Sequence, residues 1–276
     1  MSTPKDLTLP DAVTATTLHT DRGEFSALTA GDGTAGHVVL VPGWTGSKED
    51  FVPILPMLAD AGFGVISYDQ RGQFETPGAP DDDYSMAGFA ADAAAVAATT
   101  GAAPTHLLGH SFGGLVAQQA AVDDPERWRT VSLLCSGPGA LGETPERRLS
   151  DIVAALDGGV SGRDMALAMN PDLDPDSNPI DAFVVDKFDR TSTACLAAMT
   201  RHLIDTPDLT DAVAATGLPC WVGRGVDDEA WPHEAQDDQA RRLGTRTQVV
   251  PSSAHSPAIE NPSGLIAAWL PFLTAS

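Results

Sequence analysis

A serine closely flanked by glycines is the first feature of this sequence that indicates chemistry. Residues 109–113 read Gly-His-Ser-Phe-Gly, which matches the pattern G-x-S-x-G. An apolar segment at 105–108 precedes the motif, and a run of small residues at 115–122 follows it. In that context the serine occupies a sharp turn between a strand and a helix, which exposes its hydroxyl and tolerates only small neighbours. Ser111 is therefore the candidate nucleophile, and a glycine-rich packing turn is the alternative interpretation.

A serine hydroxyl is a weak nucleophile at neutral pH, so it needs a base within hydrogen-bond reach and a third group to orient that base. His255 follows the last predicted strand, 245–250, in the stretch Ser-Ser-Ala-His-Ser-Pro. A loop at that place can bring the imidazole over the C-terminal edge of a sheet. We therefore predict His255 as the general base. His110 is its main rival, and we expect it to be a structural neighbour of the serine.

The group that orients the base should lie between the serine and the histidine in the chain. Residues 225–232 read Gly-Val-Asp-Asp-Glu-Ala-Trp-Pro and come directly after the apolar segment 218–222. The candidates there are Asp227, Asp228 and Glu229. An aspartate in this position can also serve as the cap of a following helix, which is the alternative for Asp228.

An acyl-transfer site also needs hydrogen-bond donors for a developing oxyanion. Gly43 and Trp44 follow the first buried apolar segment, 37–41, and Phe112 follows the serine. The backbone N–H groups of Trp44 and Phe112 are the predicted oxyanion hole. The side chain of Trp44 either lines the pocket or belongs to the core.

These residues follow an alternation of apolar strand segments with helical patterns, which is typical of a mostly parallel sheet covered by helices. A hairpin is predicted at 13–29, and the further strands are 37–41, 64–68, 105–108, 130–135, 218–222 and 245–250. The predicted helices are 49–61, 85–100, 115–122, 234–243 and 259–273. Asp92 is expected on the outer face of its helix.

The alternation stops between residues 138 and 216, where short helical patterns surround an Asn-Pro-Asp loop. We interpret 138–216 as a helical cap inserted into a core domain made of 1–137 and 217–276. The apolar residues there suggest a pocket lining, although each can also belong to the core of the cap; they are Met165, Met169, Phe183, Phe188 and Met199.

Composition narrows the partners. The net charge of −22 argues against nucleic acid and anionic membranes, because both would repel an acidic chain. No apolar stretch is long enough to span a membrane and the N-terminus lacks a signal pattern, so a cytoplasmic location is expected. Cys135, Cys195 and Cys220 lack C-x-x-C spacing and are expected to be buried thiols. We expect no metal and no organic cofactor, and the sequence leaves homo-oligomer formation open.

Together, these motifs resemble those of the α/β-hydrolase superfamily, and within it the actinobacterial esterase- and lactonase-like members. The resemblance implies an eight-stranded, mostly parallel sheet with a helical cap. It also favours Asp228 as the acid, because Gly225, Asp228 and Pro232 fit the pattern G-x-x-D-x-x-x-P; Asp227 is second. Two segments depart from common patterns: Pro42-Gly43 stands where many relatives have His-Gly, and Phe74 stands where D-x-R-G-x-G-x-S has glycine.

The predicted function is hydrolysis of a carboxylic ester or lactone of a small, largely apolar molecule, with Ser111, His255 and Asp228 as the catalytic residues. Thioesters, amides and C–C bonds stay open as alternatives. The Pro-Gly-Trp segment also resembles that of cofactor-independent quinaldine dioxygenases, which share the fold and use the histidine as a base. A non-catalytic ligand-binding protein of the same fold is the third hypothesis.

Overall fold

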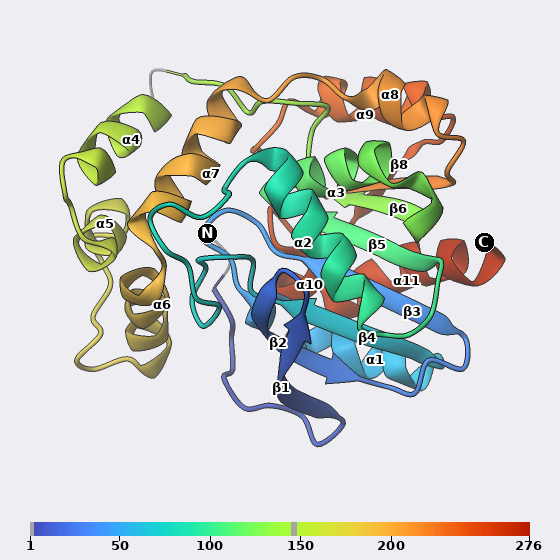
Figure 1. The fold of residues 1–276 in the computed structure, drawn as a ribbon, viewed down its shortest axis with the longest axis horizontal. Coiled ribbons are helices and arrows are strands. Elements are labelled where there is room, and N and C mark those ends of the chain that lie inside the picture. Colours follow the sequence, from blue (N-terminus) through green and yellow to red (C-terminus); the bar gives the residue numbers. More distant parts are fainter. Residues whose placement is uncertain (1–2, 145–147) are drawn as a thin grey trace.

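A sheet of eight strands organises the chain (Figure 1). The computed structural model describes residues 3–144 and 148–276. The strands are β1 (Val13–Thr20), β2 (Gly23–Ala30), β3 (Gly36–Val41), β4 (Phe63–Tyr68), β5 (Thr105–His110), β6 (Trp128–Leu134), β7 (Cys220–Gly225) and β8 (Thr247–Val250). Their order across the sheet is β1-β2-β4-β3-β5-β6-β7-β8. The pairs β1/β2 and β2/β4 are antiparallel and the others parallel, which confirms the predicted fold class.

Helices cover both faces of this sheet. One face carries α2 (Met86–Ala98), α3 (Phe112–Asp123), α8 (Thr210–Ala215) and α9 (His233–Arg242). The other carries the 3₁₀ helix η1 (Lys48–Ile54), α1 (Leu55–Asp60), α10 (Pro257–Glu260) and α11 (Pro262–Ala275). A short 3₁₀ helix, η2 (Pro125–Arg127), joins α3 to β6.

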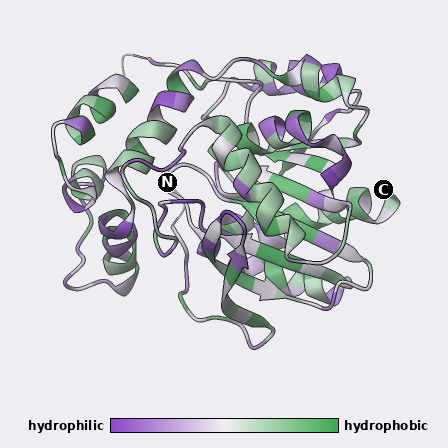
Figure 2. Ribbon diagram, viewed as in Figure 1, coloured by the Kyte–Doolittle hydropathy of each residue, from purple (hydrophilic) through white to green (hydrophobic). Residues whose placement is uncertain are grey.

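The central strands are largely apolar, as Figure 2 shows by their green colour. In β3, Val39 and Val41 pack into the cluster beneath α2 and α3, whereas Val38 and Leu40 pack into the cluster beneath α1 and α11. Successive side chains of a strand point to opposite faces, so a strand buried on both sides needs an unbroken apolar run. This explains why the apolar segments of the sequence predict the strands.

Four of the helices that follow β6 in the sequence lie to one side of the sheet (Figure 1). They are α4 (Leu149–Asp157), α5 (Gly162–Met169), α6 (Pro179–Arg190) and α7 (Thr193–Asp205). They share an apolar cluster that includes Leu156, Met165 and Phe188. α8 also falls between residues 138 and 216, but it packs against α3 and α9 beside the sheet. The division into a core and a cap at those boundaries stays a prediction.

The predicted helix 49–61 is wrong in its first half. The segment begins at Lys48 as a 3₁₀ helix and turns α-helical only from Leu55. Pro53 and Pro56 lie at this junction, and proline has no N–H to donate to an α-helical hydrogen bond. The two prolines therefore limit the α-helical part to one short stretch.

The expected exposure of Asp92 is also wrong. The side chain is buried, and it accepts hydrogen bonds from Arg22 Nε at 2.6 Å and Arg71 Nη2 at 2.7 Å. Arg22 lies in the turn of the β1–β2 hairpin and Arg71 in the loop after β4, so segments distant in sequence cover this face of α2. The two guanidinium groups pair with the carboxylate and so offset the cost of burying it.

No helix in the described part of the chain is both long enough and apolar enough to cross a lipid bilayer.

Candidate active site

Ser111 is the single residue between β5 and α3. Its φ of 55° and ψ of −120° fall in a region that residues with a Cβ atom rarely adopt. The surrounding glycines make this turn feasible. A Cβ atom at Gly109 would lie 2.0 Å from the carbonyl oxygen of Gly113, and one at Gly113 would lie 2.3 Å from that of Val41. The G-x-S-x-G spacing therefore follows from close backbone approach on both sides of the serine.

The structure places Ser111, His255 and Asp228 in one hydrogen-bonded series. Nε2 of His255 lies 3.0 Å from Oγ of Ser111, and Nδ1 of His255 lies 2.8 Å from Oδ1 of Asp228. An ionised carboxylate can only accept, so Nδ1 carries the proton and Nε2 is left to accept from the serine hydroxyl. The three residues follow β5, β7 and β8, whose C-terminal ends meet at one edge of the sheet.

Asp228 is held by more than the histidine. Its side chain is fully buried, Oδ1 accepts from the backbone N–H of Ala230 at 3.1 Å, and Oδ2 accepts from Nε2 of Gln236 at 3.2 Å. Burial by itself would raise the pKa of Asp228, but the hydrogen bond and charge of His255, with the hydrogen bonds from Ala230 and Gln236, together lower it. The neighbouring Asp227 and Glu229 are exposed. Sequence reasoning missed Gln236, because a lone glutamine on a helix carries no recognisable signal.

His110 lies next to the site but in a different environment. Its Nε2 approaches the carbonyl oxygen of His255 at 2.5 Å, and the two rings are 5.1 Å apart. Burial, together with the neighbouring imidazole of His255, lowers the pKa of His110 to about 3. A group of that pKa stays neutral at physiological pH and is too weak a base to activate a serine. The geometry agrees with its expected role as a structural neighbour.

A pocket of about 180 Å³ is lined by Ser111 and His255. Its remaining walls are mainly apolar and come from Trp44, Leu141, Met169, Leu203, Ala230 and Trp231. Trp44 thus lines the pocket, and it also packs against the apolar cluster of the cap. Of the five apolar residues singled out in the sequence, Met169 alone is among these lining residues. Met165, Phe188 and Met199 are buried in the apolar clusters instead.

The backbone around the serine supplies two donors. Trp44 lies in the loop after β3, and Phe112 is the first residue of α3. Within the described residues, the backbone N–H of neither residue has a protein acceptor. The N–H groups of the first helical turn have no partner within the helix, and they favour negative charge. These two groups are the ones expected from the sequence to form an oxyanion hole.

The described residues contain one candidate group for a metal ion. His110, Cys135 and His255 offer atoms within 4.8 Å of one another. However, Nε2 of His255 contacts Ser111 and its Nδ1 contacts Asp228, so both ring nitrogens are engaged. Nε2 of His110 contacts a carbonyl oxygen. Cys135 Sγ lies 3.8 Å from the carbonyl oxygen of Ala254, and burial raises the pKa of this thiol well above its usual value. This donor set fits a packed wall of the site better than a metal centre. All three cysteines are buried, as expected.

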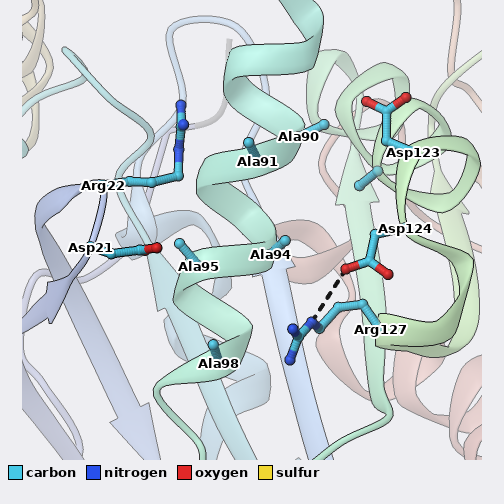
Figure 3. Close-up of a pocket in the computed structure, with 11 residues that line it drawn as sticks. Asp21, Arg22, Ala90, Ala91, Ala94, Ala95, Ala98, Asp123, Asp124 and Arg127 are labelled. Atoms are coloured by element: carbon cyan, nitrogen blue, oxygen red, sulfur yellow. Dashed lines mark ion pairs between the residues drawn. The ribbon is translucent and has the colours of Figure 1, made fainter.

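A separate hollow of about 320 Å³ lies over the exposed face of α2 (Figure 3). Alanines of α2 line it, together with Asp21 and Arg22 on one side and Asp123, Asp124 and Arg127 on the other. Arg127 pairs with Asp124 at 3.7 Å. None of its lining residues belongs to the serine site, and it contains no base beside a nucleophile.

The family follows from comparison with known proteins. The chain belongs to the α/β-hydrolase fold family, whose sequence pattern matches residues 36–196. Over 97 residues it is 41% identical to the Variovorax paradoxus protein named "Putative carbamate hydrolase RutD", covering 35% of this chain and 36% of the other. A protein of that name from Escherichia coli is 36% identical over 104 residues, 38% of each chain. The match therefore spans little more than a third of the length of these curated relatives.

Solved structures resemble almost the whole chain. The enol-lactonase from Burkholderia xenovorans has a TM-score of 0.77 with 22% identity, and the match covers 94% of this chain and 100% of that one. The N-acyl homoserine lactonase AidH has a TM-score of 0.76 with 22% identity, covering 95% and 97%. At such identities these similarities establish the shared fold.

Proposed function

We propose that this protein is a serine hydrolase that cleaves a carboxylic ester or lactone of a small, largely apolar molecule. The observation that carries the proposal is the series Asp228–His255–Ser111 at the wall of an apolar pocket. The names of the structural neighbours and the local similarity to a named carbamate hydrolase support carbonyl hydrolysis in general.

The proposed reaction begins when Nε2 of His255 takes the proton of Ser111 Oγ, which attacks the substrate carbonyl carbon. The N–H groups of Trp44 and Phe112 stabilise the oxyanion of the tetrahedral intermediate. His255 then returns the proton to the leaving alkoxide, and the alcohol departs from an acyl-serine. In a lactone the alcohol stays attached to the acyl group.

Water completes the cycle. His255 accepts a proton from a water molecule that attacks the acyl-serine, and the collapse of the second tetrahedral intermediate releases the acid and restores Ser111. Apart from the substrate and this water molecule, each step of the proposed reaction uses groups of the chain.

The pocket volume limits the substrate. A dry cavity of about 150 Å³ holds a benzene molecule, so a pocket slightly larger than that takes roughly six to eight non-hydrogen atoms. The pocket itself is about 180 Å³. Short acyl groups are therefore the proposed substrates, and small carbamates belong in the same test panel because they also present a carbonyl to the serine.

A fluorophosphonate probe followed by peptide mass spectrometry tests the proposal. The expected result is a single labelled peptide that contains Ser111. Ser111→Ala should remove the label and lower turnover of p-nitrophenyl acetate by at least about three orders of magnitude. The control Ser263→Ala changes an exposed serine and should behave like the unaltered protein. Full esterase activity in Ser111→Ala would overturn the serine-hydrolase assignment.

A further inference from the structure

Two buried glutamines hold the backbone segment that carries the proposed oxyanion donor. Nε2 of Gln73 donates to the carbonyl oxygen of Gly43 at 2.9 Å, and Nε2 of Gln70 donates to that of Pro42 at 3.0 Å. Each glutamine is 1% exposed. Consecutive carbonyl groups after β3 are thus each fixed by a side chain from the loop after β4.

The orientation of the Gln73 amide is determined by its own neighbours. The backbone N–H of Gln70 donates to Oε1 of Gln73 at 3.3 Å, and the backbone N–H of Gln73 donates to the carbonyl oxygen of Gln70 at 2.8 Å. Because an N–H group faces Oε1, the amide nitrogen must be the atom that faces Gly43.

Buried polar contacts also hold the loop after β4 in place. Asp69 is fully buried, and Oδ2 of its carboxylate pairs with Lys48 Nζ at 2.8 Å. The carbonyl oxygen of Asp69 accepts from Oγ1 of Thr76 at 2.8 Å. A loop fixed at both ends by buried polar contacts has little freedom to let Gln73 move away from Gly43.

The carbonyl of Gly43 belongs to the same peptide unit as the N–H of Trp44. This unit is planar, and in the trans form its C=O and N–H point in opposite directions. A hydrogen bond that fixes the carbonyl therefore also fixes the direction of the N–H. It also polarises the amide, which strengthens the N–H as a donor.

From this relation we infer that Gln73 is a positioning residue for the oxyanion hole: its amide aims the N–H of Trp44 at the developing oxyanion without touching the substrate. The inference rests on the proposed serine-hydrolase function. The backbone N–H of Gly46 also donates to the Gly43 carbonyl, at 3.0 Å, so loss of Gln73 leaves one of two restraints in place. The expected effect is therefore smaller than the 10²- to 10³-fold loss that typically follows removal of an oxyanion donor itself, and about tenfold is expected.

Gln73→Met tests the inference, because methionine keeps the length of the side chain and removes the donor. Gln73→Asn is the second variant, because its side chain keeps the amide but is one carbon shorter and should lose the contact with Gly43. The matched control is Gln239→Met. Gln239 is also buried, and it donates to Oε1 of Gln118 at 3.0 Å and to the carbonyl oxygen of Gly137 at 3.2 Å, away from the oxyanion segment.

The readouts are the rate constant for phosphonylation of Ser111 by the fluorophosphonate, kcat and KM for p-nitrophenyl butyrate, and the pH profile of kcat/KM. Both Gln73 variants should lower the phosphonylation rate and kcat about tenfold, with KM and the pH midpoint nearly unchanged. Gln70→Met acts one peptide earlier and should cost about threefold. Gln239→Met should lower the melting temperature without a comparable loss of rate.

The outcomes separate the two claims. If the unaltered protein is labelled at Ser111 but the Gln73 variants react as fast as Gln239→Met, the positioning role is wrong and the proposed function stands. A loss confined to KM would likewise overturn the positioning role. If the unaltered protein is not labelled at all, the proposed function fails, and this inference fails with it.

Discussion

Gln236 occupies one oxygen of the Asp228 carboxylate and so leaves the other for the histidine. Its Nε2 donates to Oδ2 at 3.2 Å, while Oδ1 faces Nδ1 of His255 at 2.8 Å. Together with the backbone N–H of Ala230, which donates to Oδ1 at 3.1 Å, this side chain from α9 fixes the orientation of the carboxylate. This arrangement has a direct consequence for the amide variant of the acid.

Asp228→Asn removes the negative charge and replaces one of the two acceptor oxygens with an NH₂ group, which on the His255 side would donate to Nδ1. Nδ1 would then have to accept, which puts the proton on Nε2 and removes the base. We expect kcat to fall by about two to four orders of magnitude. Asp227→Asn, at the exposed neighbour, should cost about tenfold or less. Steady-state kinetics of both variants check this, and the reverse ranking would make Asp227 the acid.

The pocket size predicts a preference for short acyl chains. Among p-nitrophenyl esters, kcat/KM should peak at acetate to butyrate and fall for octanoate, because an octanoyl group has more non-hydrogen atoms than the roughly six to eight that a pocket of about 180 Å³ takes. Leu203→Ala removes apolar wall atoms and should move the optimum to longer chains. Leu196→Ala is the control, since Leu196 is buried in the cap cluster and does not line the pocket. An unchanged chain-length profile in Leu203→Ala would contradict the assigned pocket.

A buried histidine far from the chemistry should make the fold sensitive to acid. Burial lowers the pKa of His106 to about 4, with a further contribution from Arg129, and its Nδ1 contacts Oγ1 of Thr130 at 2.9 Å. Between pH 6.5 and 4 the unfolded chain therefore binds more protons than the folded one, so stability is lost as the pH falls through this range. His106→Gln should flatten that decline by up to about 1.4 kcal/mol per pH unit.

Urea unfolding at a series of pH values measures this slope. The control is His19→Gln, because His19 is exposed and its loss should leave the slope unchanged. Parallel curves for the unaltered protein and His106→Gln would show that His106 titrates normally in the folded state.

Water, and not molecular oxygen, should be the second reactant. The hydrolase proposal predicts unchanged turnover under anaerobic conditions and nearly complete dependence on Ser111. The dioxygenase alternative predicts loss of activity without oxygen and only a modest effect of the serine. Oxygen uptake measured beside acid release distinguishes the two, and stoichiometric oxygen consumption would rule out the hydrolase assignment.

The features that sequence predicts well are those set by short-range constraints. The turn at Ser111 needs glycine at 109 and 113 because of backbone contacts within and beside the motif. This constraint can therefore be recognised in the sequence as the motif G-x-S-x-G. The loop that carries His255 follows directly after the last strand of the sheet. The alternation of strands and helices likewise predicts the sheet, because each element shows its own periodicity.

Contacts between segments that are distant in the sequence have no local sequence pattern from which they could be predicted. Asp92 looks like a solvated helix residue until Arg22 and Arg71 cover it, 70 and 21 positions away. Gln73 and Gln236 are ordinary polar residues until the fold brings Gly43 and Asp228 within reach. The pocket illustrates the same limit, because the helical patterns of the cap predict which residues are apolar but not which of them face Ser111.

Phe74, which stands where the common motif has glycine, links the cap to the core. Its φ is 41°, its N–H donates to Oγ1 of Thr191 at 3.1 Å, and its ring packs against Phe183 of α6. Beside it, the N–H of Ser192 donates to the carbonyl oxygen of Gly72 at 2.8 Å. The start of α7 is therefore held on the loop that also carries Gln73. If residues 138–216 were exchanged for those of a relative, residues 71–76 would have to be exchanged with them. Otherwise the contacts between the two segments would be lost, and the backbone near Gln73 would be disturbed.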